Sequence, residues 1–115
     1  MQRELHGGAP LLVAKFACVL FVCIYNKTMR YEWDPKKLAK NVQKHGVWFS
    51  DADAFEWESA LVKHDDRKYP ETRFKAIGYI GMRLYLMVFC FREVSVRIIS
   101  LRKASRKEVK EYAKT

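Results

Sequence analysis

The sequence is short of acidic residues, of cysteine and of every common cofactor motif. Thirteen acidic residues stand against 22 lysines and arginines, so the 115-residue chain has a net charge of +9 at pH 7. A basic surplus of this size favours phosphate-rich partners, with nucleic acid first and an anionic membrane surface second. Three cysteines are an odd number, which argues against a disulfide framework and for a reducing compartment. Cys90 lies in an apolar run, where it would pack as a small hydrophobic side chain.

Motifs that bind nucleotides or metals are absent from the sequence. There is no phosphate-binding loop, dinucleotide fingerprint or nucleophile elbow. Asp65, Asp66 and Glu71 are close together, but their spacing matches no calcium loop, and carboxylates in a turn are usually solvated. His64 and Cys90 lack the paired spacing of a zinc site. The sequence therefore predicts no metal and no cofactor.

Residues 1–28 differ in character from the rest of the chain. The run from Ala9 to Tyr25 is almost wholly apolar, but it is shorter than the roughly 20 residues that span a bilayer. It also makes a poor signal peptide, because Arg3 and Glu4 cancel and no clear cleavage site follows. We expect residues 1–28 to be an N-terminal extension from a misplaced start codon, outside the fold, and residues 29–115 to be one domain. A membrane anchor in residues 9–25 is the alternative.

The first part of the domain predicts two helices. Residues 31–33 read as a short extended segment, and Asp34-Pro35 then supplies an N-cap and a proline at the first helical position. Gly46 ends this helix after a basic last turn. Ser50 predicts the N-cap of a second helix, which has aromatic side chains available for burial.

Extended runs follow the helices. They cover residues 60–63, 74–80, 84–91 and 94–101. The run Leu84–Phe91 is apolar on both faces, which predicts a central strand covered on each side. Ser105 and Glu108 form a capping box that begins a C-terminal helix. Short connections favour antiparallel neighbours, so we expect an α+β fold with an antiparallel sheet of about four strands and helices packed on it.

Cationic residues gather at the end of the last strand, in the stretch RIISLRKASRKE from Arg97 to Glu108. Guanidinium groups match phosphate oxygens bidentately, and a strand end gives them a rigid base. Regular alternation puts Arg97 and Lys103 on one side of the strand and Ser100 and Arg102 on the other. These side chains would share one phosphate only if the strand contained a bend or a bulge.

Three stretches of the domain carry a resemblance to a known family. They read YEWDPKKLAKNVQKHGVWFSDA, ETRFKAIGYI and VRIISLRKASRKEVKEYA, and together they extend from about Met29 to the end of the chain. In order and spacing they resemble the BrnT toxin family, the ribonuclease half of a type II toxin–antitoxin pair. The resemblance implies a RelE-like fold, RNA cleavage and translation arrest.

The resemblance also implies a partner. A BrnA-type antitoxin with a ribbon-helix-helix DNA-binding part would neutralise the toxin, in a complex of two toxins and two antitoxins. Operator DNA would be contacted only through the antitoxin. We expect a cytoplasmic protein whose substrate is RNA and which does not act at a membrane.

Cleavage of RNA without a metal uses the neighbouring 2′-OH as nucleophile. The protein must then position an in-line attack, move protons and stabilise charge on the phosphorane. The predicted catalytic residues are Arg73, Arg97, His45 and Ser100, and the predicted RNA-binding residues are Arg102, Lys103 and Lys44. Arg73 and Arg97 rest mostly on the resemblance to the family's ETRF and RIIS motifs.

Plainer interpretations stand beside these roles. Arg97 could form an ion pair with Glu71 or Asp66, and Ser100 could bond only to backbone. His45 titrates near neutral pH, but a histidine in the last turn of a helix is often a favourable charge at the dipole's negative end.

The cations at the strand end also have other uses. Arg102 and Lys103 could be solvated charges or antitoxin contacts. The alternative function is a non-enzymatic module that binds nucleic acid through the same residues.

Overall fold

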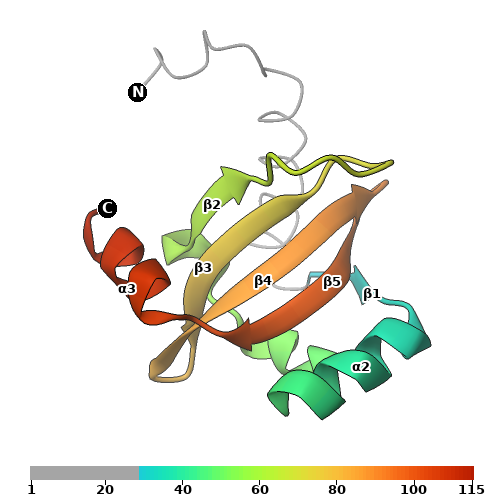
Figure 1. The fold of residues 1–115 in the computed structure, drawn as a ribbon, viewed down its shortest axis with the longest axis horizontal. Coiled ribbons are helices and arrows are strands. Elements are labelled where there is room, and N and C mark those ends of the chain that lie inside the picture. Colours follow the sequence, from blue (N-terminus) through green and yellow to red (C-terminus); the bar gives the residue numbers. More distant parts are fainter. Residues whose placement is uncertain (1–28) are drawn as a thin grey trace, which may run out of the picture. The chain divides into compact units, whose positions relative to one another are not determined.

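The computed structural model describes residues 29–115, which form one sheet with helices packed against it (Figure 1). The strands are β1 (Tyr31–Glu32), β2 (Leu61–His64), β3 (Phe74–Ile80), β4 (Arg83–Arg92) and β5 (Ser95–Lys103). The helices are α2 (Pro35–His45), α3 (Arg106–Ala113) and the short 3-10 helices η2 (Phe49–Ala54) and η3 (Trp57–Ser59). The N-terminal extension and the alternative anchor, both placed in residues 1–28, lie outside the described residues.

The strand order across the sheet is β1-β5-β4-β3-β2. Strand β1 runs parallel to β5, and every other pair of neighbours is antiparallel, so the sheet is mixed. Strand β4 is central, as its sequence predicts. Its buried side chains on one face are Leu84, Leu86, Val88 and Cys90, and those on the other are Met87 and Phe89. Burial on both faces explains why this run lacks polar alternation.

The sheet has five strands where the sequence predicted about four. The additional strand is β1, in which Tyr31 and Glu32 pair with Val96 and Arg97 of β5. Two residues are too few for a periodic pattern to identify a strand. The sequence predicted a short extended segment at residues 31–33, and pairing with β5 makes part of it a strand of the sheet.

The predicted second helix is wrong, because the segment after α2 forms 3-10 turns and α2 is the one α-helix between β1 and β2. Ser50 does not cap it, since η2 has no side-chain cap. Phe49, Ala52 and Phe55 are buried and recur every three residues, which is the period of a 3-10 helix. Gly78 of β3 makes room for this segment, because a β-carbon there would lie 2.7 Å from the Phe55 ring.

Both α-helices have the caps that the sequence predicts. The Asp34 side chain accepts a hydrogen bond from the Lys36 amide at 2.9 Å, and Gly46 ends α2 with φ of 72°, a conformation that suits glycine. Ser105 and Glu108 form the complete capping box of α3.

A β-bulge in β5 changes which side chains share a face of the sheet. The pairs with β4 along this stretch are Cys90–Arg97, Phe89–Ile98, Val88–Ser100 and Leu86–Arg102. Ile99 is the extra residue of the bulge, and the alternation shifts by one position there. Arg97 therefore lies on the same face as Ser100 and Arg102, which regular alternation would have separated.

The two faces of the sheet are covered differently. On one face, called the α3 face here, Ile77, Leu84, Leu86 and Val88 form a cluster against which Tyr112 of α3 packs. The opposite face carries the 3-10 helices, and the Trp57 ring meets Phe89 edge-on with centroids 5.3 Å apart. The bulge in β5 places both Arg97 and Arg102 on the α3 face.

Candidate functional site

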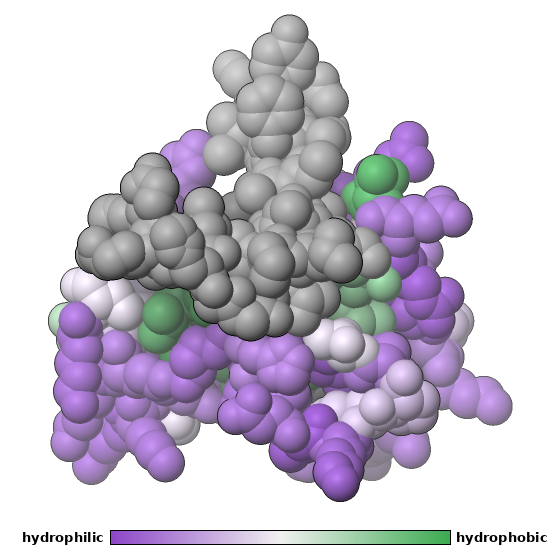
Figure 2. Space-filling model, turned by 90° about the horizontal axis from the view of Figure 1, so that it is seen from above, coloured by the Kyte–Doolittle hydropathy of each residue, from purple (hydrophilic) through white to green (hydrophobic). Residues whose placement is uncertain are grey.

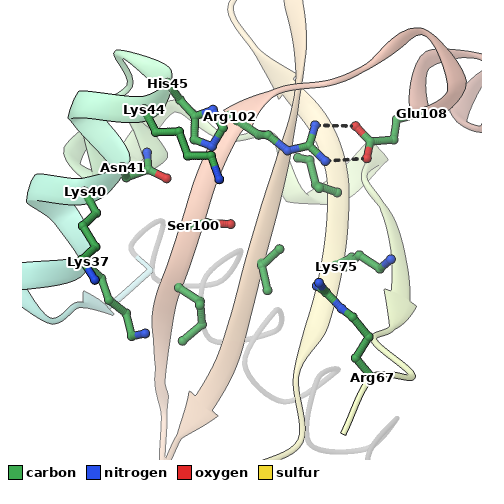
Figure 3. Close-up of a pocket in the computed structure, with 13 residues that line it drawn as sticks. Lys37, Lys40, Asn41, Lys44, His45, Arg67, Lys75, Ser100, Arg102 and Glu108 are labelled. Atoms are coloured by element: carbon green, nitrogen blue, oxygen red, sulfur yellow. Dashed lines mark hydrogen bonds and ion pairs between the residues drawn. The ribbon is translucent and has the colours of Figure 1, made fainter. Parts of the chain in front are cut away.

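A pocket of about 680 Å³ lies on the α3 face, beside α2 (Figure 3). Helix α2 lines it with Lys37, Lys40, Asn41, Lys44 and His45, and the sheet with Lys75, Leu86, Val88, Ile99, Ser100 and Arg102. Arg67, from the loop before β3, and Glu108, from α3, complete the lining. The apolar part of this lining comes from β4 and the bulge in β5.

Six cationic side chains and one carboxylate line this pocket, which is called the cationic pocket below. Lys37, Lys40 and Lys44 are spaced by three and four residues, so they share one face of α2. Among residues 29–115, neither these three nor Lys75 has a carboxylate within 4.0 Å. Hydrophilic side chains also make up most of what is visible of the described residues on the face shown in Figure 2. The lysine charges are therefore available to an anionic ligand.

His45 occupies the last turn of α2, with its ring beside Arg102 (Figure 3). Partial burial, followed by the positive charges of Lys44 and Arg102, lowers the pKa of the ring below its ordinary 6.5. A histidine that served as a charge at the helix end would show the opposite shift. The imidazole is therefore neutral at neutral pH and has a lone pair that can accept a proton.

Arg102 and Glu108 form a two-pronged ion pair across the pocket. The guanidinium nitrogens of Arg102 lie 2.9 and 2.8 Å from the two carboxylate oxygens. The same carboxylate accepts the Ser105 amide at 2.8 Å, which caps α3. Burial alone would raise the pKa of the Glu108 carboxyl, but the hydrogen bonds from Arg102 and Ser105 lower it below its usual value. The carboxylate of the pocket is thus already neutralised.

Replacement of Glu108 by glutamine should destabilise the protein more at about pH 7 than at about pH 3. A carboxyl with a depressed pKa stabilises the fold above its unfolded pKa, and this contribution is lost as the pH falls through the folded pKa. Urea unfolding at both pH values measures it. Glu58→Gln, at an exposed position with no ion pair within residues 29–115, is the matched control. An equal loss of stability at both pH values would contradict this account of the ion pair.

Arg97 and Arg73 lie on the α3 face but outside the cationic pocket. Arg97 donates to Glu32 at 3.3 Å, so its ion-pair partner is neither of the two carboxylates suggested by the sequence. Arg73 bonds Glu71 at 2.7 Å and lies 3.8 Å above the centre of the Tyr69 ring. Both guanidinium groups are held in place, with side chains 24% and 16% exposed.

Cys90 of β4 lies between these two arginines. On the β5 side it pairs with Arg97, and on the β3 side its neighbour Phe89 pairs with Phe74, the residue that follows Arg73. Burial, with a smaller contribution from the Glu71 carboxylate, raises the pKa of its thiol. The side chain is 3% exposed. Cys90 is therefore a packed, protonated core residue, as its apolar surroundings predict.

The structure brings together four of the seven predicted site residues. His45, Ser100, Arg102 and Lys44 line the cationic pocket. Lys103 lies in a separate groove of about 370 Å³ with Met82 and Val109. Arg73 and Arg97 form a second cationic group farther along the same face.

Several pocket residues were not identified from the sequence. They are Lys37, Lys40, Asn41, Arg67, Lys75 and Glu108 in its contact with Arg102. Helical spacing of the lysines on α2 was the one available signal, although lysines at such spacing usually form a solvated face. The remaining residues come from separate elements that only the folded chain brings together.

One carboxylate in the acidic loop after β2 is buried, although the sequence predicted solvated carboxylates there. Asp65 was expected to be solvated, but it is 2% exposed and is held by Arg67, whose Nη2 lies 2.9 Å from Oδ2. Hydrogen bonding from Arg67 lowers the pKa of the Asp65 carboxyl. Within residues 29–115, no group of three or more His, Cys, Asp or Glu is arranged to hold a metal ion. None of the helices in that part of the chain is long and apolar enough to cross a membrane.

Comparison with known proteins supplies a family match. The model for "Ribonuclease toxin, BrnT, of type II toxin-antitoxin system" matches residues 33–108, a range that contains every residue of the cationic pocket. The fold is similar to the crystal structure of the Brucella abortus ribonuclease toxin BrnT. The sequences are 31% identical, the match covers 69% of this chain and 100% of that one, and the TM-score is 0.52. No curated protein matches the chain.

Proposed function

The chain belongs to the BrnT family of ribonuclease toxins from type II toxin–antitoxin systems, and we propose that its cationic pocket is the place where it cleaves RNA. One observation carries this proposal: the pocket combines lysines that have no ion pair within residues 29–115 with a neutral histidine. Lysines attract phosphates, and a neutral imidazole accepts a proton. The carboxylate of the pocket opposes neither, because Arg102 neutralises it.

The substrate is single-stranded RNA lying along the α3 face. Leu86, Val88 and Ile99 give the pocket an apolar floor on which an unstacked base can lie. The lysines of α2 bind phosphates at its rim. Every second residue of β4 on this face pairs with a polar residue of β5. The pairs are Leu86–Arg102, Val88–Ser100 and Cys90–Arg97, so these polar side chains recur about every 6.8 Å along the sheet. This spacing suits a single RNA strand that runs parallel to the axis of β4.

The reaction is a metal-independent transesterification at phosphorus. The 2′-oxygen attacks phosphorus, the bond to the 5′-oxygen breaks, and the products are a 2′,3′-cyclic phosphate and a 5′-hydroxyl. His45 accepts the proton of the 2′-OH, and the departing 5′-oxygen takes a proton from an ammonium group of α2 or from water. Lys44 stabilises the charge that develops on the phosphorane, and Arg102, which stays paired with Glu108, donates to it from its remaining N–H groups.

Ser100, Arg97 and Arg73 act beside this centre. Ser100 donates a hydrogen bond to a phosphate oxygen from the pocket wall. Arg97 and Arg73 bind the adjacent phosphate and hold the strand in line for attack. Lys103, outside the pocket, contacts RNA only as a peripheral charge.

An antitoxin holds the toxin inactive, because free ribonuclease activity would arrest translation in its own host. The family implies such a partner, and its BrnA type, ribbon-helix-helix part and 2:2 stoichiometry follow the family resemblance. In the cytoplasm, where its RNA substrate lies, the complex would contact operator DNA through the antitoxin alone. Acidic antitoxin residues would meet the cationic groups of the α3 face.

Purified full-length protein should cleave labelled single-stranded RNA in the presence of EDTA. The same RNA with 2′-O-methyl groups should stay intact, because it lacks the nucleophile. Products should end in a 2′,3′-cyclic phosphate. Tight binding without cleavage would favour a nucleic-acid-binding module instead, and cleavage that requires a divalent ion would contradict metal independence. Arg97→Ala tests whether the second cationic group contributes to the rate.

A further inference from the structure

Asn41 is the buried residue of α2, although it is polar. The residue is 5% exposed, and its side chain makes three hydrogen bonds. The amide nitrogen donates to the carbonyl oxygens of Leu101 at 2.7 Å and Val47 at 2.9 Å. The amide oxygen accepts from the Leu101 N–H at 3.2 Å. Both donor hydrogens are committed, so Asn41 has none to offer a phosphate although it borders the pocket.

These bonds connect the two elements that carry the proposed catalytic groups. Leu101 lies between Ser100 and Arg102 on β5, and Asn41 lies one helical turn before His45 on α2. The bond to Val47 holds the chain where it leaves the helix. The large apolar residues of α2, Leu38 and Val42, are only partly buried, and Ala39 is exposed. Position of the helix on the sheet therefore depends strongly on the Asn41 hydrogen bonds.

We propose that Asn41 is a positioning residue, which fixes His45 of α2 relative to Ser100 and Arg102 of β5. It does so through the backbone of Leu101 and touches no reacting atom. The inference rests on the proposed function of the cationic pocket. The Asn41 amide would then contribute to catalysis as well as to stability, because the position of α2 along β5 determines where the His45 ring lies relative to the RNA.

The surroundings of His45 make its position measurable. Lys44 on its own helix and Arg102 on β5 face it with positive charge, Glu108 of α3 holds Arg102, and Lys75 of β3 lines the same pocket. A helix released from β5 would take the ring out of partial burial and away from Arg102. The pKa of His45 would then rise toward 6.5, and the acidic limb of the rate profile would move to higher pH.

The test compares full-length Asn41→Ala and Asn41→Ser with Val96→Ala. Val96 is buried on the opposite face of the sheet, so its truncation weakens the fold without touching the link between α2 and β5. The measurements are kcat and KM on single-stranded RNA across pH, and titration of the His45 ring by NMR. Asn41→Ala should lower kcat by about a hundredfold with little change in KM, and should raise the pKa of His45. Val96→Ala should change neither.

Each outcome bears on the proposal. Folded Asn41 variants with wild-type kcat, or with an unchanged His45 titration, would overturn it. The same shifts in Val96→Ala would reduce Asn41 to a general stabilising residue and overturn it as well. Should Asn41→Ala not fold, Asn41→Ser retains one donor and decides in its place. Absence of cleavage in the wild type would refute the proposed function, whereas the His45 titration would still report on positioning.

Discussion

Replacement of His45 by glutamine should lower the rate constant of RNA cleavage by about two to four orders of magnitude, the usual contribution of general base catalysis. The affinity for RNA should change little, because the imidazole is neutral when it accepts the proton. The wild-type rate should rise with pH as the ring deprotonates, through a pKa below the ordinary value. That limb should be missing from the His45→Gln profile. Single-turnover cleavage under saturating protein measures both effects.

His64→Gln is the matched control for this experiment. His64 is exposed at the end of β2, where it contacts Asp66 at 3.2 Å, and it does not line the cationic pocket. Its replacement should leave the rate and the pH profile unchanged. A similar loss in both variants, or an unaltered rate in His45→Gln, would mean that the base lies elsewhere.

Joint replacement of Lys37, Lys40 and Lys44 by glutamine should weaken RNA binding by roughly a hundredfold at low salt. Each charge-assisted contact to a phosphate contributes roughly fivefold, and the three lysines have no ion pair within residues 29–115 to compete for them. For single strands, the dependence of log affinity on log salt falls by roughly 0.7 for each lost contact, so the slope should decrease by about 2. Fluorescence anisotropy at several salt concentrations gives both values.

The chain provides a close control at α3 and its C-cap. Lys107, Lys110 and the C-cap Lys114 have the same spacing as the three lysines of α2, are exposed, and lie outside the cationic pocket. Their joint replacement removes the same charge, yet it should reduce the affinity and the salt slope only slightly. Equal losses in the two triple variants would show that net charge, and not the pocket, governs binding.

Local sequence determined much of the architecture. The Asp34 cap, the Gly46 end of α2 and the capping box at Ser105 are each encoded within a few residues, and all three were predicted. Strand β3 occupies the predicted residues 74–80, and the apolar run of β4 gave its central place. Failures occurred where partners decide. Residues 31–33 were predicted to be extended, but their parallel pairing with β5 was not, and neither was the 3-10 period of Phe49, Ala52 and Phe55 against the sheet.

The site was less accessible to sequence reasoning. A bulge at Ile99 depends on pairing with β4, yet it decides whether Arg97 shares a face with Ser100. Lys75 is in β3, whose sequence predicts a strand but does not show that Lys75 faces α2 across the pocket. Asn41 lies on the face of α2 that carries Leu38 and Val42, and two of its three hydrogen bonds reach Leu101, 60 positions along the chain. Such groupings arise from tertiary structure and leave no periodic signal.

The hydrogen bonds of Asn41 also bear on self-association. Strand β1 pairs with β5 only at Val96 and Arg97, so in the described part of the chain no strand adjoins that edge near Leu101. An unpaired strand edge can template the addition of another chain. There the Asn41 amide occupies both the N–H and the carbonyl of Leu101, as a neighbouring strand would. Helix α2 thereby blocks strand addition by a second copy of the protein at this part of the β5 edge.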